Sequence, residues 1–154
     1  MSVSTNTRKD SSLGPILQFS VYADNKVGKL NDLIGAITHA DLHILAMTVL
    51  DTTDSAIIRI VVDYHREARE ILRKSNFTFN EVEVVAVEVN QLADIHKVTC
   101  ALLQAEVNLH YIYPFLGRPS GSTAFVMRLE DSDVGTEVLQ SCGIRVLTRG
   151  DLTR

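Results

Sequence analysis

Residues 16–50, ILQFSVYADNKVGKLNDLIGAITHADLHILAMTVL, decide the fold of this chain. From Ile16 to Tyr22 apolar and polar residues alternate, which is typical of a strand with one buried face. A turn follows at 24–28, and an apolar segment rich in β-forming residues runs from Leu42 to Leu50. Between these strands a helix is predicted from apolar residues at helical spacing: Leu30, Leu33, Ile34, Ile37 and Ala40.

A third strand and a second helix follow in the same half of the chain. The strand is predicted over Ala56–Val62, after a turn at 51–54, and the helix contains the apolar residues Ala68, Ile71 and Leu72. Asp63 is predicted to cap the start of this helix. Asn76 is predicted to end it, because asparagine tolerates the left-handed backbone conformation.

The same order of elements then begins again. Further strands are predicted at 82–89, 107–113, 124–129 and 144–147, with helices around 95–105 and 134–141, the second ending at Gly143. A shift of 65 residues places Asn25 on Asn90 and His43 on Asn108, and a shift of 67 places Asp63 on Glu130. One register that holds through strand, loop and helix indicates an internal repeat.

Length, composition and charge limit the class of protein. The 154 residues are 45% hydrophobic and 22% charged, as in an ordinary globular protein. The net charge of -4 argues against a nucleic-acid partner, and no apolar run approaches the ~20 residues of a membrane span. Residues 1–14 are polar and aperiodic and are expected to form a disordered tail without a signal peptide, which favours a cytoplasmic protein. Cys100 and Cys142 are expected to be reduced.

Two βαββαβ units predict two four-stranded antiparallel sheets, each with two helices on one face. We expect the sheets to lie side by side, with all helices on one side of the molecule. The strands at 42–50, 56–62 and 82–89 carry apolar residues on both faces, whereas a solvated face would be polar in alternation. We therefore expect the open face to be buried against a second copy of the chain, as a homodimer.

The sequence resembles the tandem ACT domain proteins. The matching segments are FSVYADNKVGKL (19–30), ADLHILAMT (40–48), IRIVVD (58–63), EVVAVEVNQL (83–92), AEVNLHYIY (105–113) and MRLED (127–131). The resemblance implies an α+β fold of two ferredoxin-like ACT repeats, at 15–80 and 81–154. It also implies regulatory binding of an amino acid at the interface of two ACT units, with no cofactor and no catalysis, and regulation of a metabolic enzyme in trans.

The chemistry of the loop before each first helix supports a ligand site. A helix N-terminus offers unpaired N–H groups and partial positive charge to a carboxylate, and a glycine lets the ligand approach the backbone. The first predicted site comprises Asn25, Lys26, Val27, Gly28, Lys29, Leu30 and Asn108. The second comprises Asn90, Gln91, Leu92, Ala93 and His43. Ala93 and His43 depart from the family pattern, so the second site is expected to be degenerate or differently selective.

Other interpretations compete with this one. Gly28 and Asn25 could only shape a turn, and Asn108 could only satisfy nearby backbone groups. The histidines at 39, 43, 96 and 110 give a weak metal signal, the acidic residues at 81, 83 and 88 are expected along a solvated strand, and Tyr111 and Tyr113 are expected in the core or an interface. The alternative function is a structural or regulatory subunit that binds a partner protein through its sheet face without a ligand.

Overall fold

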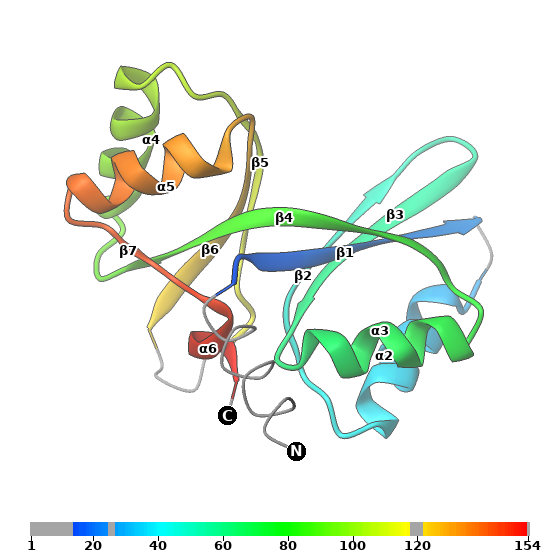
Figure 1. The fold of residues 1–154 in the computed structure, drawn as a ribbon. Coiled ribbons are helices and arrows are strands. Elements are labelled where there is room, and N and C mark those ends of the chain that lie inside the picture. The colour runs from blue at the N-terminus through cyan, green and yellow to red at the C-terminus, as the bar shows by residue number, and fades with distance from the viewer. Residues whose placement is uncertain (1–13, 25–26, 118–121, 154) are drawn as a thin grey trace.

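The computed structural model describes residues 14–24, 27–117 and 122–153 (Figure 1). Of the tail expected at 1–14, only Gly14 lies within the described residues. The elements run in the order β1 (Ile16–Asp24), α2 (Lys29–His39), β2 (Ile44–Asp51), β3 (Ser55–Val62), α3 (His65–Lys74), β4 (Thr78–Val89), α4 (Asp94–Gln104), β5 (Leu109–Pro114), β6 (Thr123–Leu129), α5 (Ser132–Ser141), β7 (Arg145–Val146) and α6 (Arg149–Leu152). The duplicated α+β order is therefore confirmed, and the short α6 is an addition that the sequence pattern did not predict.

The strand β4 belongs to both repeats. Its residues Thr78–Val84 pair with β1, and Val85–Val89 pair with β6. Its second part also pairs with β7 on the other edge. The first repeat thus has the strand order β4-β1-β3-β2 and the second has β7-β4-β6-β5, which is one ferredoxin-like order used twice. The strand runs unbroken across the repeat boundary expected between residues 80 and 81.

Local chemistry explains where the helices end. Asn76 follows α3 with φ 59°, and Gly143 follows α5 with φ 80°. Both residues thus have the left-handed conformation that the prediction of these helix ends requires. Asp131 caps α5, because its side chain accepts from the Val134 N–H at 3.0 Å. The prediction for Asp63 is wrong: Tyr64 is the N-cap of α3, and the Asp63 carboxylate instead accepts from the His43 backbone N–H.

Each repeat has its own core between its helices and its part of the sheet. In the first repeat Phe19 and Ile60 of the sheet pack with Leu33 of α2 and Leu72 of α3. The corresponding core of the second repeat contains Val87, Leu102, Met127 and Leu139. The helices therefore cover one face of each half of the antiparallel sheet, as expected.

The two open faces bury each other within one chain. A third core joins Ile16, Ala46 and Val61 of the first repeat to Tyr113 and Val126 of the second. Leu152 of α6 packs against the same core. At the outer edges the Leu116 N–H donates to the Leu45 carbonyl at 2.7 Å, so the sheet curls until β5 meets β2.

This packing corrects two expectations. The pair α2 and α3 and the pair α4 and α5 lie on opposite outer sides of the molecule, instead of sharing one side (Figure 1). The open face is buried as the apolar pattern predicted, but the other repeat covers it in place of a second copy. The physical reason is that both repeats share the strand β4. Its successive residues point to opposite faces, so Val85 and Val87 pack in the helix-covered core of the second repeat and Val84 and Ala86 pack in the central core.

A polar network lies inside the central core. Gln18 of β1 is fully buried, and its Nε2 donates to Tyr111 Oη at 2.9 Å and to Ser20 Oγ at 3.0 Å. The Tyr113 hydroxyl donates to Gln18 Oε1 at 2.6 Å, and Arg59 lies 3.7 Å from the centre of the Tyr111 ring. Tyr111 and Tyr113 are therefore core and inter-repeat residues, which confirms that prediction.

Candidate functional site

The first candidate loop ends at the N-terminus of α2. Gly28 is the N-cap of this helix with φ 95°, and as a glycine it has no side chain to cap the helix. A side chain at this position would be strained by the backbone, although a Cβ would meet no atom within 4 Å. Val27 is fully exposed, whereas Asn25 and Lys26 lie outside the described residues. The described part of this loop therefore offers a close approach to backbone donors.

A hollow of about 220 Å³ adjoins this loop. It lies at the end of the first repeat, where β1 leads into α2 and where β2 and β3 meet their hairpin turn. Its lining residues are Ala23, Asp24, Val27, Lys29, Leu30, Val49, Ala56 and Ile58. Three of the predicted site residues thus border one concave surface.

The second candidate loop already holds a carboxylate. Asp94 Oδ2 accepts from the backbone N–H groups of Asn90 and Gln91, each at 3.1 Å. Ala93 has the ordinary helical backbone angles φ -63° and ψ -21°, unlike its counterpart Gly28. Asp94 is the first residue of α4, as Lys29 is of α2. The chain's own side chain therefore occupies amides that a ligand carboxylate would otherwise use.

The polar residues just before the second strand of each repeat, His43 before β2 and Asn108 before β5, form hydrogen bonds within their own repeats. The His43 backbone N–H donates to Asp63 Oδ1 at 2.9 Å, and His43 Nδ1 lies 3.0 Å from Asp63 Oδ2. Asn108 donates its side-chain Nδ2 to Glu130 Oε2 at 2.7 Å and its backbone N–H to the same oxygen at 3.3 Å. The two contacts are equivalent in the repeat. The His43 side chain is half exposed, so part of it remains accessible.

A single chain does not bring together the two halves of either predicted site. The end of β1, next to Val27–Leu30, lies at the far end of the first repeat, whereas Asn108 lies before the start of β5 in the other half (Figure 1). The loop 90–93 and His43 are likewise in different halves of the molecule (Figure 1). Among the described residues, the central core fills the space between the repeats.

Comparison with known proteins identifies the family. A family model described as an ACT domain pair matches residues 15–154. The chain belongs to the ACT domain pairs. No curated protein matches it.

Solved structures share the fold of this ACT domain pair at low sequence identity. Protein BT0572 from Bacteroides thetaiotaomicron is 24% identical, with 94% of this chain and 99% of that one covered and a TM-score of 0.83. The ligand-free regulatory subunit of aspartate kinase from Thermus thermophilus is 11% identical, with 86% and 97% covered and a TM-score of 0.56. The corresponding subunit from Thermus flavus is 11% identical, with 86% and 99% covered and a TM-score of 0.52.

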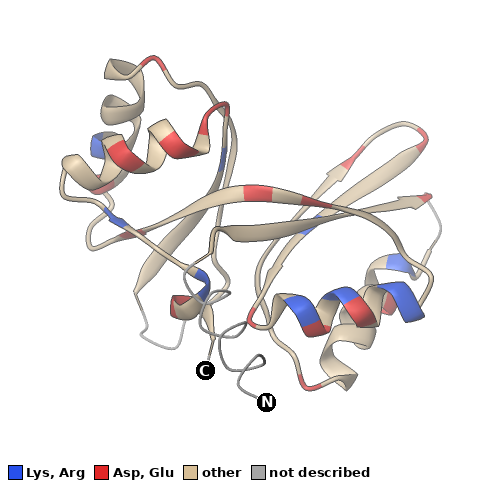
Figure 2. Cartoon of the chain, in the orientation of Figure 1, with Lys and Arg blue, Asp and Glu red and all other residues tan. Residues whose placement is uncertain are grey.

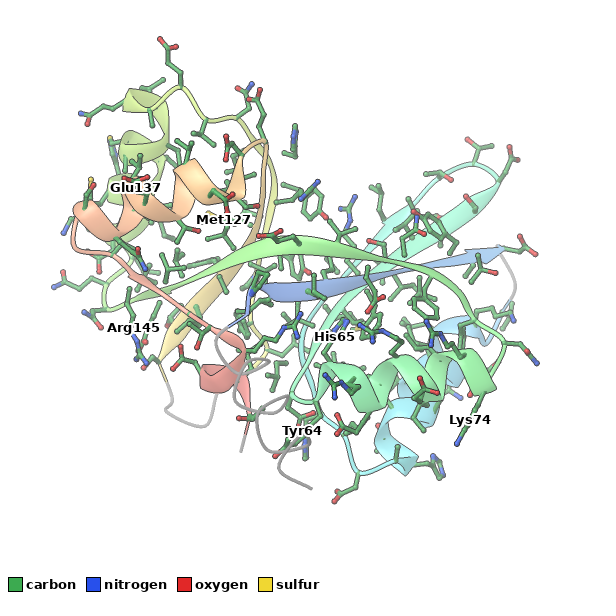
Figure 3. All side chains as sticks on the ribbon, in the orientation of Figure 1. Tyr64, His65, Lys74, Met127, Glu137 and Arg145 are labelled. Atoms are coloured by element: carbon green, nitrogen blue, oxygen red, sulfur yellow. The ribbon has the colours of Figure 1, made fainter. Side chains whose placement is uncertain are left out.

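Sequence reasoning missed a partly buried charged cluster in the first repeat around His65, the first residue of α3 (Figure 3). The His65 ring stacks on Phe19 with centroids 4.0 Å apart, and its Nε2 lies 2.5 Å from Glu81 Oε1. Arg69 also pairs with Glu81, at 2.7 Å. Burial lowers the pKa of His65, and these partners lower the pKa of Glu81 despite its own partial burial. Glu81 is exposed, as expected, and it also pairs with His65 and Arg69.

The remaining features give no second kind of site. Within the described ranges, no three His, Cys, Asp or Glu side chains converge as a metal site requires. Cys100 and Cys142 are free thiols. Along the sequence of α3 basic and acidic residues are interspersed (Figure 2). None of the helices in the described part of the chain is long and apolar enough to span a bilayer.

Proposed function

We propose that this ACT domain pair is a non-catalytic regulatory protein that binds a free amino acid at the β1–α2 loop. The observation that carries the proposal is the contrast between the two loops. The N-terminus of α2 follows a glycine and lies beside a hollow, whereas Asp94 accepts from the amides of Asn90 and Gln91 in the loop before α4. The second loop thus already holds a carboxylate of the chain itself, and we assign the ligand carboxylate to the first.

The energetics of such a site suit a metabolite sensor. The carboxylate would accept from the N–H groups of Val27 and Gly28, and each hydrogen bond to a charged group contributes about 1.5–3 kcal/mol. Lys29, at the start of the helix, adds positive charge on the same side. A ligand of this size then binds in the micromolar to millimolar range, where metabolite concentrations can regulate occupancy.

We further propose that a homodimer completes the site. Asn108 and the first loop lie apart in one chain, so their predicted pairing requires Asn108 of a second protomer. Asn25 and Lys26, from the same loop, would complete the polar shell, and the loop 90–93 with His43 would remain the weaker site. Ligand binding between protomers would couple occupancy to assembly and so make the response allosteric.

A metabolic enzyme is the proposed partner, in the cytoplasm. Two solved structures with this fold are regulatory subunits of aspartate kinase, which is a precedent for such a role. The alternative function is the binding of a partner protein through the open sheet face without a ligand. The other repeat covers that face, so it is not available to a partner.

Thermal melting against each of the twenty amino acids tests the proposal. A ligand at 100 times its dissociation constant adds about 2.7 kcal/mol of stability, which is a shift of several degrees. The variant Gly28→Phe should lose the shift. Gly143→Phe is the matched control, because Gly143 also has positive φ and open space around a Cβ. No shift with any amino acid, or equal loss in both variants, would contradict the proposal.

A further inference from the structure

We infer that the ligand is an amino acid with an aliphatic side chain, and that this side chain occupies the hollow beside the β1–α2 loop. The inference rests on the proposed function and adds the class of ligand to it. It is carried by the composition of the hollow, by the small residues that create it, and by the larger residues at the equivalent positions of the second repeat.

The walls of the hollow are apolar. Among the described residues, six of the eight that line it carry only hydrocarbon side chains: Ala23, Val27, Leu30, Val49, Ala56 and Ile58. Val49 is 45% exposed and Leu30 is 37% exposed, so apolar surface of both faces solvent beside the hollow. A hydrocarbon group placed there would remove their apolar surface from water, whereas a polar side chain would find few partners on these walls.

Two small residues create the space. Ala23 of β1 and Ala56 of β3 are direct cross-strand partners, so their side chains lie next to each other on one face of the sheet. On the same ladder Val21 pairs with Ile58, and Ile58 pairs with Val49 of β2. Because α2 begins only at Lys29, the last pairs of the sheet extend beyond the helix layer. The small side chains of Ala23 and Ala56 therefore leave a hollow next to the β1–α2 loop.

The second repeat has larger residues at the equivalent positions. Strand pairing aligns Val21–Ile58 with Val87–Phe125, so Phe125 stands in place of Ile58. The next position on each strand places Val89 opposite Thr123, where the first repeat has the two alanines. Phe125 packs against the core of its own repeat. The second repeat thus has both a loop that holds its own carboxylate and larger residues at the strand positions beside it.

Charge placement orients the ligand. Asp24 and Lys29 are the charged residues of the described part of the lining, and they lie on the two sides of the β1–α2 connection. With the carboxylate at the N-terminus of α2 near Lys29, the ammonium lies towards the end of β1, where Asp24 supplies the opposite charge. The ligand side chain then points into the apolar hollow. The hollow has a volume of about 220 Å³ and is open to solvent on one side.

Titration calorimetry of the full chain with alanine, valine, leucine, serine and aspartate tests this class. Leucine should bind at least about tenfold more tightly than alanine, because the added methylenes leave water, and serine and aspartate should bind no better than alanine. Tighter binding of serine or aspartate than of leucine would overturn the inference and leave the proposed function standing. Binding of none of the five would overturn the inference, and a lack of any melting shift with all twenty amino acids would overturn the proposed function as well.

A filled hollow provides the second test. Ala56→Leu should weaken leucine binding about tenfold or more while leaving alanine binding within about threefold. Thr123→Leu, at the equivalent position of the second repeat, is the matched control and should leave both affinities unchanged. The alanine affinity shows that the Ala56 variant is folded and its loop intact. Unchanged leucine affinity in Ala56→Leu, or an equal loss in Thr123→Leu, would overturn the inference.

Discussion

Replacing Gln18 by leucine should destabilise the protein by about 2–4 kcal/mol, because Gln18 joins the two repeats inside the central core. The variant has a similar volume but removes the acceptor of the Tyr113 hydroxyl and the donor to Ser20. Tyr113 is 4% exposed and Ser20 is 5% exposed, so neither group can turn to water. A buried polar group left without a partner costs about 1–3 kcal/mol, and Tyr111, which is less buried, adds less.

Urea unfolding with a double-mutant cycle measures this effect. Tyr113→Phe removes the orphaned hydroxyl, so the double variant should recover part of the loss, with a coupling energy of about 1–2 kcal/mol. The slope of the transition should stay constant, since the surface exposed on unfolding is similar. Gln140→Leu on the exposed face of α5 is the control and should stay within about 0.5 kcal/mol of wild type. A coupling energy near zero would refute the face-to-face packing of the repeats.

Three further variants test other parts of the structure. Gly135→Ala should lower stability by about 1–3 kcal/mol, since a Cβ there would overlap a fully buried leucine of β6. Gly35→Ala in α2 is the control: a Cβ has room there, so this variant should stabilise the protein by about 0.5–1 kcal/mol. Thermal melts measure both effects. Burial holds the pKa of His65 below its ordinary 6.5, so the unfolded chain binds a proton that the folded chain does not. The free energy of unfolding should therefore fall as the pH drops below about 6.5. This fall should be less steep in His65→Gln than in the control His96→Gln, and the same pH dependence in both variants would contradict this explanation. Asp94→Ala should cost about 1–2 kcal/mol and should make the melting temperature more sensitive to acetate than in wild type, because two loop amides lose their acceptor; an unchanged response would count against a self-occupied loop.

The duplicated order of elements was predictable because local periodicity encodes it. Alternation marks the strands, helical spacing marks the helices, and the backbone preferences of Asn76 and Gly143 mark where two helices end. The packing of the repeats was not predictable in this way, since the contact of Gln18 with Tyr113 spans 95 positions. One signal was available: the segment 78–89 contains no glycine or proline, which is consistent with a strand that runs unbroken through both repeats.

The candidate site was predictable only as far as the loops themselves. The repeat alignment matched Asp63 to Glu130, and the two carboxylates make equivalent contacts in the structure. Asp63 accepts from His43, and Glu130 accepts from Asn108, each just before the second strand of its repeat. The role of Asp94 depends on its position as first residue of α4, one residue after the predicted loop. The hollow depends on cross-strand neighbours such as Ala23 and Ala56, which no periodicity along the chain reveals.

The central claim is one working amino-acid site per chain, at the loop that contains Gly28. Titration calorimetry of the wild-type chain with leucine tests it most directly, with Gly28→Phe and Gly143→Phe measured beside it. The account predicts saturable binding with one site per chain, lost in Gly28→Phe and kept in Gly143→Phe. Two equivalent sites per chain, or binding that survives in Gly28→Phe, would contradict it.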